Sequence, residues 1–180
     1  MFWGKLEIEN LKLSNFTKER NMIYSKLSTL LITNLTIESL DSQSKYLQSD
    51  LQMTNSSLIS HQIISENSNI SIHGSIIQKS TSSTFSFFDS NISVSNCIFD
   101  DNRAVKGGAI NIQCSLLCSS ILSNNSFLNN QASISGGALT YSSPRPLLVN
   151  NTFRNNSAPY GNDISSFPTK IKLSQTAIKA

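Results

Sequence analysis

Apolar residues recur along this chain in a fixed frame around an asparagine. In seven successive segments one apolar residue lies two positions before this marker and another lies three positions after it. The markers are Asn10, Asn34, Asn55, Asn96, Asn124 and Asn150, with Gly74 taking the position once. The apolar partners are Ile8, Ile32, Met53, Ile72, Val94, Leu122 and Leu148 before the marker, and Leu13, Ile37, Leu58, Ile77, Phe99, Phe127 and Phe153 after it. Such a repeat, 19 to 28 residues long, predicts a solenoid.

Each repeat predicts a short strand that ends in a corner. In five of the seven segments another apolar residue lies four positions before the marker, which gives an alternation with period two. That period is typical of a half-buried strand, so Ile92, Val94 and Asn96 are expected to point to one side. The period then breaks, and the next apolar residue begins a second short strand. The pattern therefore predicts a coil of a parallel β-helix.

A leucine-rich repeat is the main structural alternative at this repeat length. Its consensus needs several leucines and usually room for a helix. The segments between the markers are instead rich in Ser, Thr and Asn with β-branched residues, which favour strands and turns. We therefore expect an all-β fold of about seven coils.

Two roles are open for the marker asparagines. Stacked inward amides can bond to one another in a ladder and close the corner from inside. Alternatively, Asn serves because it tolerates left-handed turn conformations, and the two roles are compatible. We expect a ladder of Asn10, Asn34, Asn55, Asn96, Asn124 and Asn150, pointing inward.

Two further motifs appear in the last three segments. Phe99, Phe127 and Phe153 each begin an F-x-x-N sequence, which predicts an aromatic stack. Two of these are followed by G-G-A and an apolar residue, and the third by Tyr160-Gly161-Asn162. Glycines at such positions allow a tight corner or a close backbone approach. The expected turn glycines are Gly107, Gly108, Gly136, Gly137 and Gly161.

Residues 92 to 168 resemble the repeats of the polymorphic outer membrane proteins of chlamydiae, because F-x-x-N and G-G-A motifs alternate in order. The stretch from Tyr160 to Pro168 resembles the end of the repeat array in large surface proteins of ciliates. The resemblance implies a right-handed parallel β-helix of the pectin-lyase-like type, displayed at the cell surface or outside the cell. It implies no particular activity. Residues 1 to 91 share only the coil periodicity.

We expect one β-helix domain over residues 1–168, most regular over 92–168. Residues 169–180 would be a C-terminal extension or the start of a further segment, and neighbouring coils of a longer polypeptide are expected. The chain begins without the apolar run of a signal peptide, and it has no run of about 20 apolar residues that would span a bilayer. The net charge of +3 is mild and scattered, which argues against nucleic acid as a partner. Surface glycans or other proteins are the expected partners.

Eight N-x-S/T sequons are present, and a chain so rich in Ser, Thr and Asn would contain about five by chance. They begin at Asn15, Asn34, Asn55, Asn69, Asn91, Asn124, Asn150 and Asn155. Those on the marker column are expected to be inward and inaccessible, which leaves Asn69, Asn91 and Asn155 as candidate glycosylation sites. Cys114 and Cys118 are a candidate disulfide if the domain is extracellular, and Cys97 a packed thiol.

No metal site or cofactor is expected, because neither histidine lies near the cysteines in the repeat. A catalytic role would need paired carboxylates or a calcium-binding acidic cluster. Asp89, Asp100, Asp101 and Arg103 form the only approximation, and we expect this acidic group to be a solvated turn.

We therefore expect a segment without enzymatic activity in a larger cell-surface or secreted protein, acting as a structural or adhesive display scaffold. A carbohydrate-active enzyme (a polysaccharide lyase or glycosidase) or a glycan-binding module on the same fold is the alternative, and a degenerate fragment without a role of its own is a third.

Overall fold

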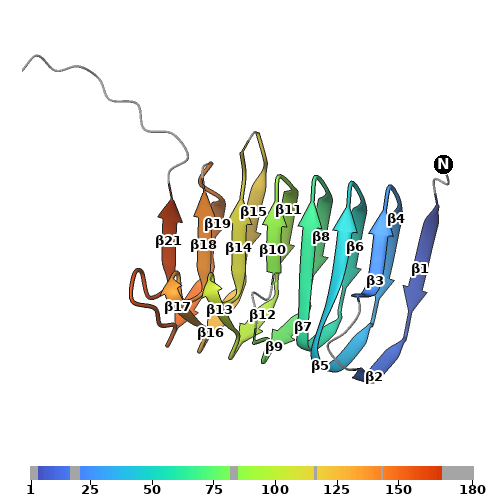
Figure 1. The fold of residues 1–180 in the computed structure, drawn as a ribbon, viewed down its shortest axis with the longest axis horizontal. Helices are drawn as coiled ribbons and strands as arrows, with labels where there is room; N and C mark the ends of the chain where they lie inside the picture. The colour runs from blue at the N-terminus through green and yellow to red at the C-terminus, as the bar shows by residue number, and fades with distance from the viewer. Residues whose placement is uncertain (1–3, 17–20, 82–84, 116, 143, 168–180) are drawn as a thin grey trace, which may run out of the picture.

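The chain forms a parallel β-solenoid of about seven coils (Figure 1). The computed structural model describes residues 4–16, 21–81, 85–115, 117–142 and 144–167. The strands lie side by side from β1 at one end of the stack to β21 at the other (Figure 1), and every strand pairing is parallel. The predicted fold class is thus confirmed. The predicted C-terminal extension lies outside the described residues.

Three sides make up each coil. Side one is a seven-stranded sheet of β1 (Lys5–Glu9), β4 (Thr29–Thr33), β6 (Asp50–Thr54), β8 (Asn69–His73), β11 (Asn91–Ser95), β15 (Ser120–Ser123) and β19 (Leu147–Val149). Side two holds β2 (Lys12–Phe16), the first halves of β5 (Thr36–Leu47) and β7 (Ser57–Glu66), β9 (Ile76–Gln78), β12 (Ile98–Asp100), β16 (Ser126–Leu128) and β20 (Thr152–Arg154). Side three holds β3 (Asn21–Lys26), the second halves of β5 and β7, β10 (Phe85–Phe88), β14 (Ile110–Gln113), β18 (Leu139–Ser142) and β21 (Ile164–Phe167).

The coils widen along the stack. Equivalent residues are 19 apart between β6 and β8 but 28 apart between β11 and β15. The extra length in coils five and six includes a short pair, β13 (Arg103–Lys106) with β17 (Gln131–Ser135), inserted between sides two and three. In coils two and three, by contrast, β5 and β7 run through that corner without a break.

The two apolar columns predicted from the sequence form the core. Residues two before the marker face inward on side one, and those three after it face inward on side two; both are buried in coils two to six. Phe99, Phe127 and Phe153 are in register, with ring centroids 5.0 and 4.8 Å apart and nearly parallel planes. Such contacts add about 1 kcal/mol each beyond burial. A third column on side three, including Ile63, is one that the marker frame does not predict.

Most corners consist of one outward residue and one inward residue. The first has φ near +50°, and the second begins the next strand from inside. The marker asparagines take the first position, with φ of 49–54°, and all six are exposed. The prediction that they point inward is therefore wrong, because the positive φ ends the strand alternation and turns the side chain outward. The alternative role, tolerance of the left-handed conformation, fits this geometry.

The internal ladder lies one residue later than predicted. At the corner between sides one and two the inward residues are Leu35, Ser56, Ser75, Cys97 and Asn125. Where the residue is serine, its hydroxyl accepts from the corner N–H of the previous coil, as Ser75 Oγ does from Ser56 N at 3.1 Å, and donates to the carbonyl two residues back. Of the marker side chains, Asn34 donates to Asn10 at 2.9 Å, outside the coil.

In the wide coils asparagines take such inward corner positions, as Asn125 does at this corner and Asn102, Asn130 and Asn156 do at the corner that ends side two. Asn130, the last residue of an F-x-x-N motif, accepts from the N–H and the amide of Asn102 and donates to Asn156 at 3.0 Å and to the Phe99 carbonyl at 3.0 Å. All three asparagines are buried. Amides can make these bonds in both directions along the stack, since they carry donors and an acceptor.

Candidate functional site

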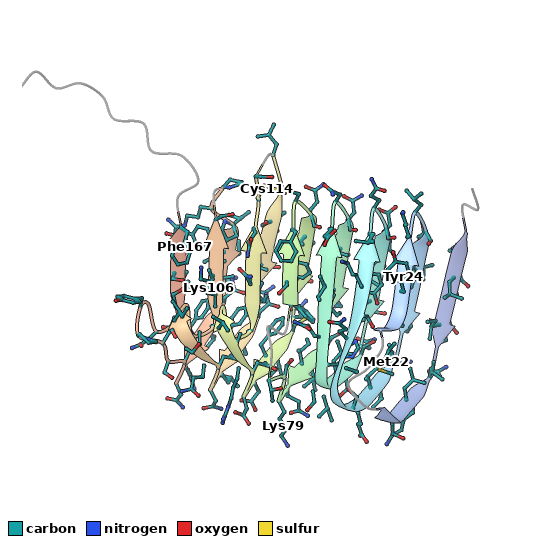
Figure 2. All side chains as sticks on the ribbon, viewed as in Figure 1. Met22, Tyr24, Lys79, Lys106, Cys114 and Phe167 are labelled. Atoms are coloured by element: carbon teal, nitrogen blue, oxygen red, sulfur yellow. A yellow bond between two sulfur atoms is a disulfide. The ribbon has the colours of Figure 1, made fainter. Side chains whose placement is uncertain are left out.

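A groove on the outer face of side three is the principal candidate site. It crosses β10, β14, β18 and β21 and has a volume of about 390 Å³. Its floor is the outward row of these strands, in which Asn111 is in register with Thr140. Lys106 and Phe167 lie at one side, and the end of β14 at Cys114 forms the rim (Figure 2).

The sequence builds this groove through the G-G-A corner. Gly107 has a φ of +60°, in the region that side chains rarely adopt. A Cβ on Gly108 would meet the Gly137 carbonyl and the backbone of Gln131, so only glycine allows this approach between coils. The corner thus leads the chain directly from Lys106 into β14, which carries Asn111. Gly136, Gly137 and Gly161 take the equivalent positions in the following coils.

The rim is held by a covalent and a charged contact. Cys114 and Cys118 form a disulfide with their Cα atoms 6.1 Å apart. Between them, Ser115 donates its N–H and its hydroxyl to the Asp89 carboxylate at 2.6 and 2.8 Å. Across the groove, Lys106 Nζ lies 4.6 Å from the centroid of the Phe167 ring, a cation–π contact.

Asn111 offers a polar side chain to the floor of the groove. It is 8% exposed and lines the groove. Among the described residues its amide has no hydrogen-bond partner, whereas the Thr140 hydroxyl bonds to Ser135 and Ser165 and the Ser142 hydroxyl accepts from Cys114 N at 2.7 Å. The amide faces the open groove, so a ligand that offers a hydroxyl or carbonyl can hydrogen bond to it.

The acidic residues considered for catalysis are not brought together. Asp89 lies at the end of β10 on the groove rim, while Asp100 and Asp101 lie at the end of β12, where side two ends. Asp101 pairs with Arg103 at 3.5 Å with both side chains about half exposed, and Asp100 accepts from Asn129 at 2.8 Å. Asp100 and Asp101 therefore belong to a solvated corner.

Asp89, Cys114 and Cys118 offer three potential metal-ligand atoms within 4.8 Å of one another. The two sulfurs are bonded to each other, and only a thiolate is a good ligand. Metal binding here would therefore require reduction of the disulfide.

The candidate glycosylation asparagines form ladders on the outside. Asn69 donates to Asp50 at 2.8 Å, and Asn91 donates to Asn69 at 3.0 Å. Asp50, Asn69 and Asn91 lie along a second groove of about 430 Å³ over side one. Asn155 donates to Asn129 at 3.4 Å.

Two buried polar groups lie away from the grooves. His61, 1% exposed, is hydrogen bonded to Ser42 Oγ at 2.6 Å and Ser44 Oγ at 2.9 Å inside coils two and three. Burial lowers the pKa of His61 to about 4. Cys97 is a buried free thiol whose pKa burial raises to about 11. Nothing in the sequence predicted the His61 cluster, because its serines lie in β5 of one coil and His61 lies in β7 of the next.

Comparison with known proteins gives a limited match. The chain is 36% identical over 104 residues to a transmembrane domain-containing protein of Dictyostelium discoideum. The match covers 53% of this chain and 6% of that relative, so the chain spans a small fraction of its length. No protein-family profile matches the chain, and no solved structure matches it. Within the described residues, no helix has the length and apolar character needed to cross a membrane.

Proposed function

We propose that this chain is a structural β-helix segment of a larger cell-surface or secreted protein, serving as a display scaffold without enzymatic activity. The observation that carries the proposal is that the residues of the repeat motifs make structural contacts within the solenoid. Phe99 and Phe127 stack in the core, Asn102 and Asn130 bond between coils, and the paired glycines allow the backbones of successive coils to approach. The motif residues thus make the rod itself.

Two likenesses support a place in a larger surface protein. The motifs resemble those of polymorphic outer membrane proteins, which carry β-helical repeats outside the cell. The Dictyostelium relative is far longer than the matched segment, and its name refers to a transmembrane domain. Because each coil contacts only its neighbours, a solenoid of this kind can be lengthened by adding coils, which suits a spacer.

Surface labelling of intact cells tests this proposal. An antibody against residues 92–167 should detect a labelled band far larger than the 19.8 kDa of this chain. An unlabelled band near that mass would overturn both the surface location and the display role.

A glycan-binding module is the second candidate, and the Asn111 amide in the side-three groove favours it. The Phe167 ring and the Asn111 amide line one groove, which suits the apolar face and the hydroxyls of a sugar. On a glycan array, binding that Asn111→Ala abolishes and Gln52→Ala on side one preserves would support this role. Release of new sugar ends from a polysaccharide would instead identify an enzyme.

A further inference from the structure

The marker asparagines form an exposed column at the corner between sides one and two. Four of them begin an N-x-S/T sequon: Asn34, Asn55, Asn124 and Asn150. All four are exposed, and the φ of 50–54° at Asn34, Asn124 and Asn150 and of 49° at Asn55 directs each side chain away from the coil. The sequons of the marker column, which were expected to be inward and inaccessible to a glycan, are therefore on the surface.

The amides of this column differ in their hydrogen bonds. Asn34 donates its amide to Asn10. The amides of Asn55, Asn124 and Asn150 have no hydrogen-bond partner among the described residues. At Asn55 the reason is visible, because Gly74 takes the marker position in the next coil and presents no side chain to bond.

Three off-column sequons, at Asn69, Asn91 and Asn155, are in the opposite situation. Asn69 and Asn91 donate their amides to Asp50 and Asn69, and Asn155 donates to Asn129. Each of these amide nitrogens lies within 3.4 Å of a side-chain oxygen in the neighbouring coil, so a sugar attached there would crowd the side-chain ladder.

We propose that this column is an N-glycosylation ridge, modified at Asn55 and at one of Asn124 and Asn150. In the reaction the amide Nδ2 bonds to C1 of a sugar on a lipid-linked oligosaccharide. The bond from C1 to the lipid pyrophosphate breaks, the pyrophosphate leaves, and the amide loses one proton. The inference rests on the proposed function, because that donor is found in the secretory pathway.

Coil spacing limits the occupancy. Asn124 and Asn150 lie in neighbouring coils, about 4.8 Å apart by strand spacing, which is too close for two glycans side by side. Asn55 and Asn124 are three coils apart, about 14 Å, and both can be modified on one molecule. The ridge therefore holds about two glycans, at separate points on one corner of the rod.

Site mapping of the secreted full chain tests the ridge. The chain is expressed behind a cleavable signal peptide in cultured animal cells, and glycans are removed enzymatically in heavy-oxygen water, which marks each formerly glycosylated asparagine. Label is expected at Asn55 and at either Asn124 or Asn150. No intact molecule should carry label at both Asn124 and Asn150. Secreted and retained pools are mapped alike, so poor secretion does not prevent the reading.

Sequon variants that keep the asparagine provide the control. Ser57→Ala removes the Asn55 sequon and should remove one glycan mass, whereas Ser71→Ala removes the Asn69 sequon and should change nothing. Label at Asn69, Asn91 or Asn155 with a bare column would overturn the inference, as would a chain without glycans. Because the signal peptide is supplied, those results would not bear on the display proposal, which native surface labelling tests separately.

Discussion

Narrow and wide coils solve the same corner problem with different side chains. In the narrow coils, residues 29–90, the inward corner residue is most often a serine with two hydrogen bonds, as at Ser75. In the wide coils, residues 91–167, it is more often an asparagine, and Asn130 makes four. The longer amide reaches the neighbouring coil's side chain as well as its backbone. The comparison indicates that coil width and corner residue change together, while the left-handed turn stays constant.

Substitution in the aromatic stack of the wide coils should lower the free energy of unfolding more than any other change considered. Phe127→Asp places a charge between two rings in a fully buried position, and we expect a loss of at least about 4 kcal/mol in the free energy of unfolding. Ser126→Asp, the preceding residue on the outer face of β16, should change it by less than about 0.5 kcal/mol. Urea unfolding followed by circular dichroism measures both. Equal tolerance would contradict the inward assignment of Phe127.

The narrow coils should carry a pH dependence that the wide coils lack. His61 is buried neutral with a pKa near 4, below its usual 6.5, so the unfolded chain binds a proton more readily. Stability is therefore fully present above pH 6.5 and falls as the pH is lowered toward 4, by about 3 kcal/mol in all.

Unfolding curves from pH 7 to pH 4 measure this loss. His61→Gln should flatten the slope, because position 61 then carries no titratable group. A slope that survives in His61→Gln would mean that another group is responsible.

Removing one ladder residue from each region compares the serine ladder of the narrow coils with the asparagine ladder of the wide coils. Asn130→Ala leaves the buried Asn102 N–H without its partner, removes one donor from the Phe99 carbonyl, and should cost about 2–3 kcal/mol. Ser75→Ala removes two hydrogen bonds in a narrow coil and should cost about 1 kcal/mol. Thermal unfolding of the two variants gives the order, and a larger loss for Ser75→Ala would refute the stronger role given to the amide ladder.

The smallest effect is expected at the exposed turn position. Asn55→Gly should be nearly neutral, because glycine adopts φ of +49° freely and the side chain has no partner among the described residues. Asn55→Val should cost about 1–2 kcal/mol, because a branched side chain resists that conformation. The difference in midpoint of urea unfolding between the two variants is the measurement. Equal losses would show that the amide, and not the backbone, matters at this position.

The sequence predicted what hydrophobicity encodes and missed what backbone conformation decides. The columns of Val94 and Phe99 were visible because burial selects apolar residues. The outward turn at Asn96 was not, because a positive φ interrupts the alternation without changing the composition. The buried partner one residue later varies from Leu35 to Ser56 to Cys97, so no single residue type marks it.

The candidate sites show the same division. Cys114 and Cys118 were close enough in sequence to suggest the disulfide that the structure contains. The side-three groove was not predictable, because Asn111, Lys106 and Phe167 come together only through the register of β14, β18 and β21. The stacking of strands from successive coils forms that groove, and the spacing of residues along the sequence does not reveal it.

Thiol accessibility tests the corner geometry most directly, and the ladders and the glycan ridge both depend on it. Asn55→Cys and Ser56→Cys, each made in the full chain, are exposed to a thiol reagent under folding conditions. Cys97 is buried and the other two native cysteines are paired, so they provide no background in the folded state. The thiol at position 55 should react at once, and the thiol at 56 only after unfolding. Fast reaction at 56 with protection at 55 would contradict the outward turn and restore the inward marker column.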